Sequence, residues 1–384
     1  MSTHAKSLLP ILLHADNLPV YTSPFPTVHP LTKKRIVPFY ITFKDFQHGL
    51  PPVGLVTMDV VKMLSKEKGI KLFQNAREVK SCSQADREGN GKACPDGNCR
   101  KKEHEGGKTK KAFKLTIKSV YFTDEVNAKG KKGRTECVTR ILNSWRAEGK
   151  FPQAMKLWMD EMFPIYASPK SFIFNTCKPA AHEPFSNIAF EMERAGVPLF
   201  GCQAFGIHLT AYEGQGENMK VWVPRRSANR YRSPLKYDSS VAGGLPVGHT
   251  PIQGLVKECE EEAGWPDKLI RKYARSAGIV TYFEIKDEHI LPNAEYTYDL
   301  PLPARDSSDY VLPKPNDDEV DSFELLSVPR VTEAIRNGEF KPSSAVVTVD
   351  FLIRHGFVSP ENEPNYEEVV RRCHRRCGVS GPGI

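Results

Sequence analysis

Three glutamates in the second half of this 384-residue sequence have a spacing that is typical of a cation site. Glu258, Glu261 and Glu262 stand at positions i, i+3 and i+4, which places their carboxylates on one face if the segment is helical. Clustered anions repel one another, so the arrangement requires a counter-ion. Because every ligand atom would be an oxygen, the pattern favours a hard divalent ion, Mg²⁺ or Mn²⁺. The alternative is an acidic helix face that is simply solvated.

The residues that flank the glutamates predict how they are held. Thr250 is a good N-cap residue, Pro251 suits the first helical position, and Gly264 is a typical stop signal. We therefore predict a helix between the cap and this glycine. Just before it, Gly243 and Gly244 allow a tight turn and the close approach of a ligand. A glycine loop followed by an acid-faced helix is suited to a metal ion and a diphosphate, which weighs against the solvated face.

The segment from Ala242 to Pro266 resembles the Nudix box, whose pattern is a glycine, five residues, Glu, seven residues and then Arg-Glu-apolar-x-Glu-Glu-x-Gly-apolar. Gly243 takes the first position, and the closing positions are filled from Lys257 onwards. Two residues depart from the pattern. His249 stands where the first Glu is usual, which removes an auxiliary carboxylate. Lys257 stands where Arg is usual, which keeps the charge but loses the planar fork. The resemblance implies a Nudix hydrolase.

Segments spread over most of the chain carry a second resemblance. They are RTECVTRILNSWRAEGKFP, LFGCQAFGIHLTAY, WVPRRS, the box, PKPNDDEVDSFELL and FKPSSAVVTVDFLIRHGFVSPENEP. These segments are similar to the fungal and plant Nudix subfamily related to thiamine pyrophosphokinase, which has its own N-terminal domain. The subfamily implies hydrolysis of oxidised or damaged thiamine diphosphate to the monophosphate. The long basic insert after Cys82 departs from its pattern.

Five residues are predicted to contact the substrate. Arg225 and Arg226 are adjacent residues that directly follow a predicted strand. One of them can bind a diphosphate through paired hydrogen bonds. The alternative is one arginine paired with a carboxylate and the other facing solvent. The glycine loop contributes Gly243 and Gly244 to this set, and the box contributes Lys257.

The predicted reaction is substitution at phosphorus by water. A cation held by Glu258, Glu261 and Glu262 neutralises the diphosphate and lowers the pKa of a bound water. A carboxylate, Glu262 or Glu319, takes the proton. Glu319 comes from an acidic loop before a predicted strand, and the alternative for it is a solvated residue. The predicted catalytic set is therefore these four glutamates.

Two rival functions remain open from the sequence. The first is the same chemistry on an oxidised nucleoside diphosphate such as 8-oxo-dGDP, because nothing in the sequence separates a thiamine ring from a purine. The second is a non-catalytic ligand-binding protein with a degenerate box, which only His249 and Lys257 support. A site that prefers an oxidised ring needs a donor for the added oxygen, and the candidates are His208, Arg230 and Tyr298.

The elements that position these residues are expected to form two domains in an α/β fold, since the length allows two cores. Residues 1–195 are predicted to form an N-terminal α+β domain with a basic loop insert near 82–135. Residues 196–360 are predicted to form a Nudix-type α/β/α sandwich with a mixed sheet, and 361–384 a C-terminal tail.

Apolar spacing and end signals place individual elements. The predicted helices are Ser7–Ala15, Val53–Lys66, Cys137–Glu148, Pro184–Ala195 and Pro342–His355, besides the helix of the glutamates. The predicted strands include Ala112–Phe122, Ala204–Ala211, Met219–Pro224, Ile279–Ile285, Glu295–Leu300 and Phe323–Ser327.

Composition narrows the partners and the compartment. Nine cysteines, odd in number and scattered, favour a reducing, cytoplasmic location over a disulfide framework. Cys82, Cys94, Cys99 and His104 have no common zinc spacing, so a solvated loop is favoured there. No apolar run approaches the length of a membrane span. The net charge of +8 belongs mostly to the insert, and without interleaved aromatic residues it disfavours nucleic acid as a partner. The oligomeric state is left open.

Overall fold

The computed structural model describes residues 6–19, 23–79, 99–100, 112–174, 186–286 and 289–383. Most of the predicted basic insert lies outside these residues. The side chains of the zinc alternative, which are Cys82, Cys94, Cys99 and His104, also lie outside them. Within the described part of the chain, no helix combines the length and the apolar character needed to cross a membrane.

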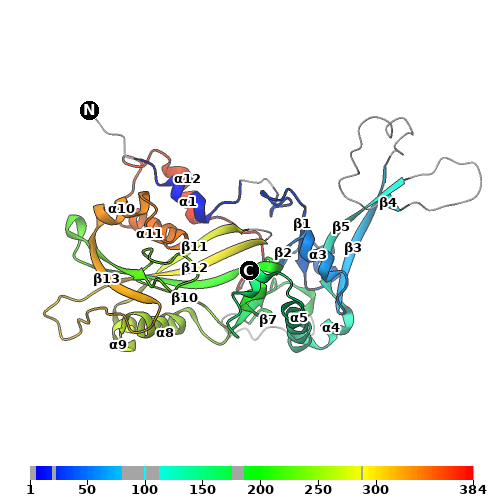
Figure 1. Ribbon diagram of the computed structural model, residues 1–384, viewed down its shortest axis with the longest axis horizontal. Helices are drawn as coiled ribbons and strands as arrows, with labels where there is room; N and C mark the ends of the chain where they lie inside the picture. The colour runs from blue at the N-terminus through cyan, green and yellow to red at the C-terminus, as the bar shows by residue number, and fades with distance from the viewer. Residues whose placement is uncertain are drawn as a thin grey trace, which may run out of the picture.

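The N-terminal half contains a five-stranded sheet, a separate two-stranded sheet and one long helix (Figure 1). Its strands are β1 (Ile36–Tyr40), β2 (Gly54–Thr57), β3 (Ile70–Val79), β4 (Cys99–Arg100) and β5 (Ala112–Phe122), and a separate pair is formed by β6 (Met162–Tyr166) and β7 (Ile188–Glu193). The strand order is β2-β1-β5-β3, with β4 beside β5 and β1 parallel to β5. The helices are α2 (Phe43–Gln47), α3 (Met58–Leu64), α4 (Asp124–Ala128), α5 (Gly130–Ala147) and α6 (Pro152–Met155).

The C-terminal half contains a second, six-stranded mixed sheet. Its strands are β8 (Ala204–Glu213), β9 (Lys220–Arg226), β10 (Val241–Gly244), β11 (Arg275–Lys286), β12 (His289–Pro301) and β13 (Val320–Ser327). The order is β11-β12-β8-β9-β13, with β10 also paired to β8. Only the β12–β8 pair is parallel among the described pairings of this sheet.

Helices cover both faces of this second sheet (Figure 1). One face carries α8 (Pro251–Ala263) and α9 (Asp267–Tyr273), which share a core with Ile207, Leu209 and Trp222. The other face carries α1 (Leu9–Ala15), α10 (Val328–Arg336), α11 (Pro342–Arg354) and α12 (Tyr366–Cys373), packed on Val221 and Val280 among others. A mixed sheet between two helical layers confirms the predicted α/β/α sandwich.

The strand β10 can form because β9 pairs only with the C-terminal end of β8. β9 pairs with β8 only at Tyr212 and Glu213, so the first part of β8 is open on that side. β10 fills the gap and pairs antiparallel, with Gly244 opposite Gly206. The glycine loop of the predicted site is thereby fixed to the centre of the sheet, directly before α8.

Two predicted helices are wrong in the described chain. The segment Val53–Lys66 begins as β2 and turns helical only at Met58, because its first apolar residues pair with β1. Within Pro184–Ala195, residues Ile188–Glu193 form β7, which pairs with β6 and is mostly buried. A short apolar run does not distinguish a strand from a helix, and pairing with a neighbour decided both segments.

The first and last described segments pack on the same half of the molecule. Asp16, next to α1, is fully buried and accepts hydrogen bonds from Arg372 and Arg375. The predicted tail therefore includes a helix, α12, that contributes Val369 and Cys373 to the core. The two halves also meet at α7 (Val197–Phe200), which contacts both β2 and β12. The domain division near residue 196 remains a prediction.

Candidate active site

The helix that carries the glutamates has the predicted ends. Thr250 caps α8 with its hydroxyl, which accepts a hydrogen bond from the Gln253 backbone at 3.4 Å, and the Gln253 side chain accepts one from the Thr250 backbone at 2.9 Å. Gly264 ends the helix with φ +65°, a left-handed conformation that glycine adopts without strain. These ends set the length of α8, and the burial of Leu255 and Cys259 against the sheet determines which face of the helix carries the glutamates.

Glu262 is the most deeply placed of the three glutamates on α8. Its side chain is buried against the sheet, and one carboxylate oxygen accepts a hydrogen bond from the Ala242 backbone at 3.0 Å. Burial, and next the charge of Asp238, raise its pKa well above the usual range, and Glu258 and Glu319 add to the effect. A bound cation would stabilise the ionised form of this carboxylate.

Glu258 lies against the glycine loop. A Cβ added to Gly243 would stand 2.2 Å from the carboxyl carbon of Glu258, so no larger residue fits there without moving that carboxylate. Burial raises the pKa of Glu258, and the charges of Glu261 and Glu319 raise it further against the opposing effect of Lys257. The first glycine of the box is thus explained by its contact with the glutamate.

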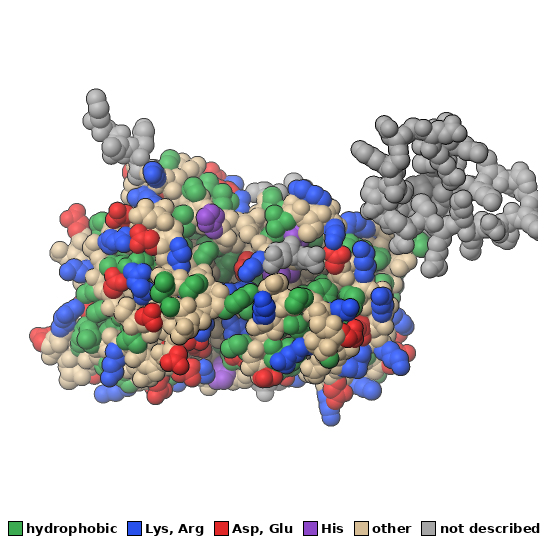
Figure 2. All heavy atoms as spheres, viewed as in Figure 1, with side chains coloured by type: hydrophobic (Ala, Val, Ile, Leu, Met, Phe, Trp, Pro, Cys, Tyr) green, Lys and Arg blue, Asp and Glu red, His purple; other side chains and the backbone are tan. Residues whose placement is uncertain are grey.

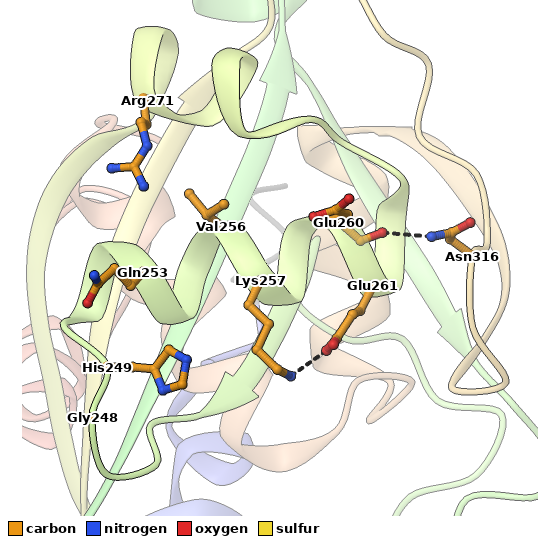
Figure 3. Close-up of a pocket in the computed structure, with 9 residues that line it drawn as sticks. All are labelled: Gly248, His249, Gln253, Val256, Lys257, Glu260, Glu261, Arg271 and Asn316. Atoms are coloured by element: carbon orange, nitrogen blue, oxygen red, sulfur yellow. Dashed lines mark hydrogen bonds and ion pairs between the residues drawn. The ribbon is translucent and has the colours of Figure 1, made fainter.

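Glu261 points outward and is paired with Lys257. The two charged ends are 2.5 Å apart, and the lysine nitrogen is also 3.6 Å from Glu258. Both residues line a hollow of about 620 Å³ on the outer face of α8, which also includes His249 and Arg271 (Figure 3). The ammonium group of Lys257 therefore neutralises part of the acidic face. His249, where the box usually has Glu, is exposed at the rim of this hollow.

Glu319 joins the carboxylates from the other side. It lies in the loop before β13, and its charge acts on both Glu258 and Glu262. Its backbone oxygen accepts a hydrogen bond from Ser227 at 2.9 Å, and its side chain forms an ion pair with Arg230. The structure thus brings the four predicted catalytic glutamates into one region.

The two arginines predicted to clamp substrate both have protein partners. Arg226 is buried, with its guanidinium 2.5 Å from Asp238 and bonded to the backbone oxygens of Arg232 and Ser233. Arg225 pairs with Glu324 at 3.1 Å. Both therefore hold the β9–β10 connection in place, and their contact with substrate remains a prediction.

Gly244, the second glycine of the loop, faces the N-terminal half. A Cβ there would stand 2.9 Å from the ring of Phe163 on β6, and the backbone of Val247 donates a hydrogen bond to Met162 at 3.0 Å. Nothing in the sequence marked Phe163 as a neighbour of the box, because the contact joins segments about eighty residues apart. The site is therefore closed on this side by the N-terminal half.

The donor set suits a hard cation. The carboxylate oxygens of Glu258 and Glu262, whose pKa values are raised first by burial and then by neighbouring carboxylates, provide the charge and chemistry that Mg²⁺ or Mn²⁺ requires. Among the described residues, no three ligating side chains converge in a complete metal-binding arrangement, since Glu261 is turned to Lys257. That pair is half exposed, and such i,i+4 pairs contribute only about 0.3–0.5 kcal/mol, so turning Glu261 inward costs little.

Comparison with known proteins agrees with the fold and with the position of the site. Residues 204–346, from β8 into α11, match the family model described as NUDIX domain. This region is a Nudix domain. All four glutamates of the site lie within it. Residues 1–203 lie outside the match, and a family-specific domain in the N-terminal half remains a prediction.

Curated relatives extend the similarity beyond the Nudix domain. An uncharacterised protein of Saccharomyces cerevisiae is 35% identical over 58% of this chain and 62% of its own length. Nudix hydrolase 24, chloroplastic, of Arabidopsis thaliana is 35% identical over 62% of this chain and 59% of its own length. The matches thus span about three-fifths of these relatives. A crystal structure from Deinococcus radiodurans covers 45% of this chain and 83% of its own, at 20% identity and a TM-score of 0.28.

Proposed function

We propose that the protein is a metal-dependent Nudix diphosphatase. The observation that carries this is the group of four glutamates in the Nudix domain, three on α8 and one before β13. Burial, and next the charges of neighbouring carboxylates, raise the pKa values of Glu258 and Glu262. Relatives that are named Nudix hydrolases support the activity. Figure 2 shows acidic and basic side chains intermixed over one face of the molecule, which suits a small substrate better than a long polyanion.

Different residues of the chain have different roles in the proposed reaction. Glu258, Glu261 and Glu262 would hold Mg²⁺ or Mn²⁺, which when bound supplies charge neutralisation and an activated water. Water forms the new bond to phosphorus, and the bridging oxygen leaves with its electron pair. Glu319 or Glu262 accepts the proton of the water. Gly243, which has no side chain, leaves free the space that the carboxylate of Glu258 occupies.

For the substrate we propose an oxidised or otherwise damaged thiamine diphosphate, which the enzyme hydrolyses to the monophosphate. The support is the similarity of segments across the chain to the subfamily related to thiamine pyrophosphokinase. An oxygen added to the ring is an acceptor, and a buried donor placed for it would be left unpaired by the intact cofactor. Of the three candidate donors, His208 is buried and Tyr298 is half-buried on the same sheet.

A substrate panel tests this proposal. We expect oxy-substituted thiamine diphosphate to be hydrolysed with at least about tenfold higher kcat/KM than intact thiamine diphosphate, a difference of about 1.4 kcal/mol in transition-state binding. Phosphate release would be followed with and without Mg²⁺. Equal kcat/KM values for both compounds would mean that the enzyme is a general diphosphatase. A clear preference for 8-oxo-dGDP would mean that its substrate is a purine nucleotide and not a thiamine derivative.

A further inference from the structure

The connection between β9 and β10 places a group of cations beside the acidic site. Residues 225–236, RRSANRYRSPLK, contain four arginines and one lysine. The connection is attached to the loop before β13, because the Ser227 backbone donates a hydrogen bond to Glu319 at 2.9 Å. It also reaches the N-terminal half, where the Tyr231 hydroxyl donates to Gln153 at 3.3 Å. The connection therefore lies beside the loop that carries Glu319.

Most of these cations are used to hold the connection itself. Arg226 is buried with Asp238, and Arg225 pairs with Glu324 and donates to the Leu235 backbone at 3.1 Å. Lys236 donates to the backbone of Gly338. Arg232 lies 4.0 Å from Glu284, on β11. These interactions fix the backbone on both sides of Arg230 and leave it as the cation of this connection that pairs with a proposed catalytic carboxylate.

Arg230 has a different kind of partner. Its guanidinium pairs with Glu319, which belongs to the carboxylate group that surrounds the proposed cation site. The two side chains are 34% and 39% exposed, so the pair is open to solvent and can exchange partners. Exposed ion pairs are weak, whereas a guanidinium can make two parallel charge-assisted hydrogen bonds to a phosphate group.

From this geometry we propose that Arg230 is the substrate-binding arginine of the site, and that it leaves Glu319 to bind a phosphate of the incoming diphosphate. Without substrate, the pair neutralises Glu319 and keeps the guanidinium beside the reaction centre. When a diphosphate arrives, Arg230 exchanges the carboxylate for phosphate oxygens, and the side chain of Glu319 is released toward the site. Substrate binding and the availability of Glu319 are thereby linked.

This assignment differs from what the sequence suggested, which named Arg230 only as a candidate donor to the added ring oxygen. In the segment WVPRRS, the sequence predicted Arg225 and Arg226 as the phosphate clamp. In the structure both donate hydrogen bonds to backbone oxygens of the connection and hold it in place. The proposal rests on the proposed function, because it requires that the site accept a diphosphate. Its test therefore measures binding of a diphosphate analogue that is not hydrolysed, and parent activity is recorded separately.

The experiment uses methylenediphosphonate and isothermal titration calorimetry on the full chain, with and without Mg²⁺. We expect Arg230→Gln to weaken binding at least about tenfold, and Arg230→Lys to give an intermediate loss because the charge stays but the fork is lost. Arg232→Gln is the matched control in the same connection and should bind within about twofold of the parent. Melting temperatures of all variants confirm that each is folded.

A second pair of variants tests the exchange itself. Without metal, Glu319→Gln should tighten methylenediphosphonate binding at least about threefold, because it frees the guanidinium from its carboxylate. Asp318→Asn, which removes the neighbouring exposed charge without releasing an arginine, should change binding clearly less. In an Arg230→Gln background, the gain from Glu319→Gln should fall to that of the Asp318 control.

The outcomes separate this proposal from the proposed function. Arg230→Gln binding within twofold of the parent, or an equal loss in Arg232→Gln, would overturn the assignment of Arg230, while an active parent would leave the diphosphatase intact. Equal gains in Glu319→Gln and Asp318→Asn would overturn the exchange. A parent that neither binds methylenediphosphonate nor hydrolyses any diphosphate would instead contradict the proposed function.

Discussion

Individual residues in the Nudix domain are explained best by the neighbour that each one must accommodate. Gly243 has no side chain because the Glu258 carboxylate lies where its Cβ would be. Lys257, in place of the arginine usual in the box, lies between Glu258 and Glu261 and lowers the repulsion between them. The spacing of the glutamates was visible in the sequence, but the ion pair that turns Glu261 outward depends on rotamers and was not.

A histidine outside the site should give the protein a pH-dependent stability. His374 follows α12, and its ring pairs with Asp350 of α11 at 3.0 Å. The hydrogen bond to Asp350 raises the pKa of His374 above its ordinary value of 6.5. A group whose pKa is raised by folding stabilises the folded state fully below the unfolded pKa. That stabilisation is lost as pH rises through the folded pKa, above the ordinary histidine range.

Urea unfolding from pH 5.5 to 9 measures this effect. The free energy of unfolding of the parent should exceed that of His374→Gln at the acidic end, and the difference should shrink as pH rises. His14→Gln, at an exposed position of α1, is measured beside it as a control for replacing a histidine. A difference from the parent that grows with pH for His374→Gln would contradict the assigned pairing.

At the scale of elements, the helix of the glutamates was predictable and the strand before it was not. The cap, the proline and the final glycine of α8 are local signals, and the helix begins and ends where they place it. The strand β10 has the sequence VAGG, which offers too few apolar residues for a strand pattern. It forms because β9 leaves β8 unpaired there. The segment Ile188–Glu193 was likewise decided by pairing with a distant strand.

The cap of α8 should contribute measurably to stability. Thr250→Ala removes the hydroxyl that accepts from Gln253 and breaks the reciprocal pair at the start of the helix. We expect the free energy of unfolding to fall by about 1 kcal/mol. Thr250→Ser, which retains the hydroxyl, should stay within about 0.3 kcal/mol of the parent. Equal losses in both variants, measured by urea unfolding, would assign the effect to the methyl group and not to the cap.

Across the whole molecule, ion pairs join segments from opposite ends of the described chain. Asp16 is fully buried and accepts from Arg372 at 2.7 Å, from Arg375 at 2.9 Å and from the Phe283 backbone at 2.9 Å. No sequence pattern predicted this, since both arginines are more than 350 positions from Asp16. The pairing makes α1 and α12 part of the layer that covers the catalytic sheet.

Removing this buried carboxylate should therefore be costly. Asp16→Ala leaves two arginines without their shared partner, and we expect the free energy of unfolding to fall by about 3 kcal/mol. The control is Glu367→Gln, because Glu367 pairs with Arg371 on the exposed surface of α12, and its effect should stay below about 0.5 kcal/mol. Similar values for the two variants would mean that the Asp16 group does not hold the ends of the fold together.

The most direct measurement of the central claim compares Glu261→Gln with Glu260→Gln in Mg²⁺-dependent phosphate release. Both glutamates are exposed neighbours on α8, so neither change should affect folding, but only Glu261 belongs to the proposed cation site. We predict that Glu261→Gln lowers kcat/KM by about two or more orders of magnitude, as expected for the loss of a main charge-stabilising group. Glu260→Gln should stay within about threefold of the parent. Activity of Glu261→Gln within about threefold of the parent would contradict a metal-dependent site on this helix.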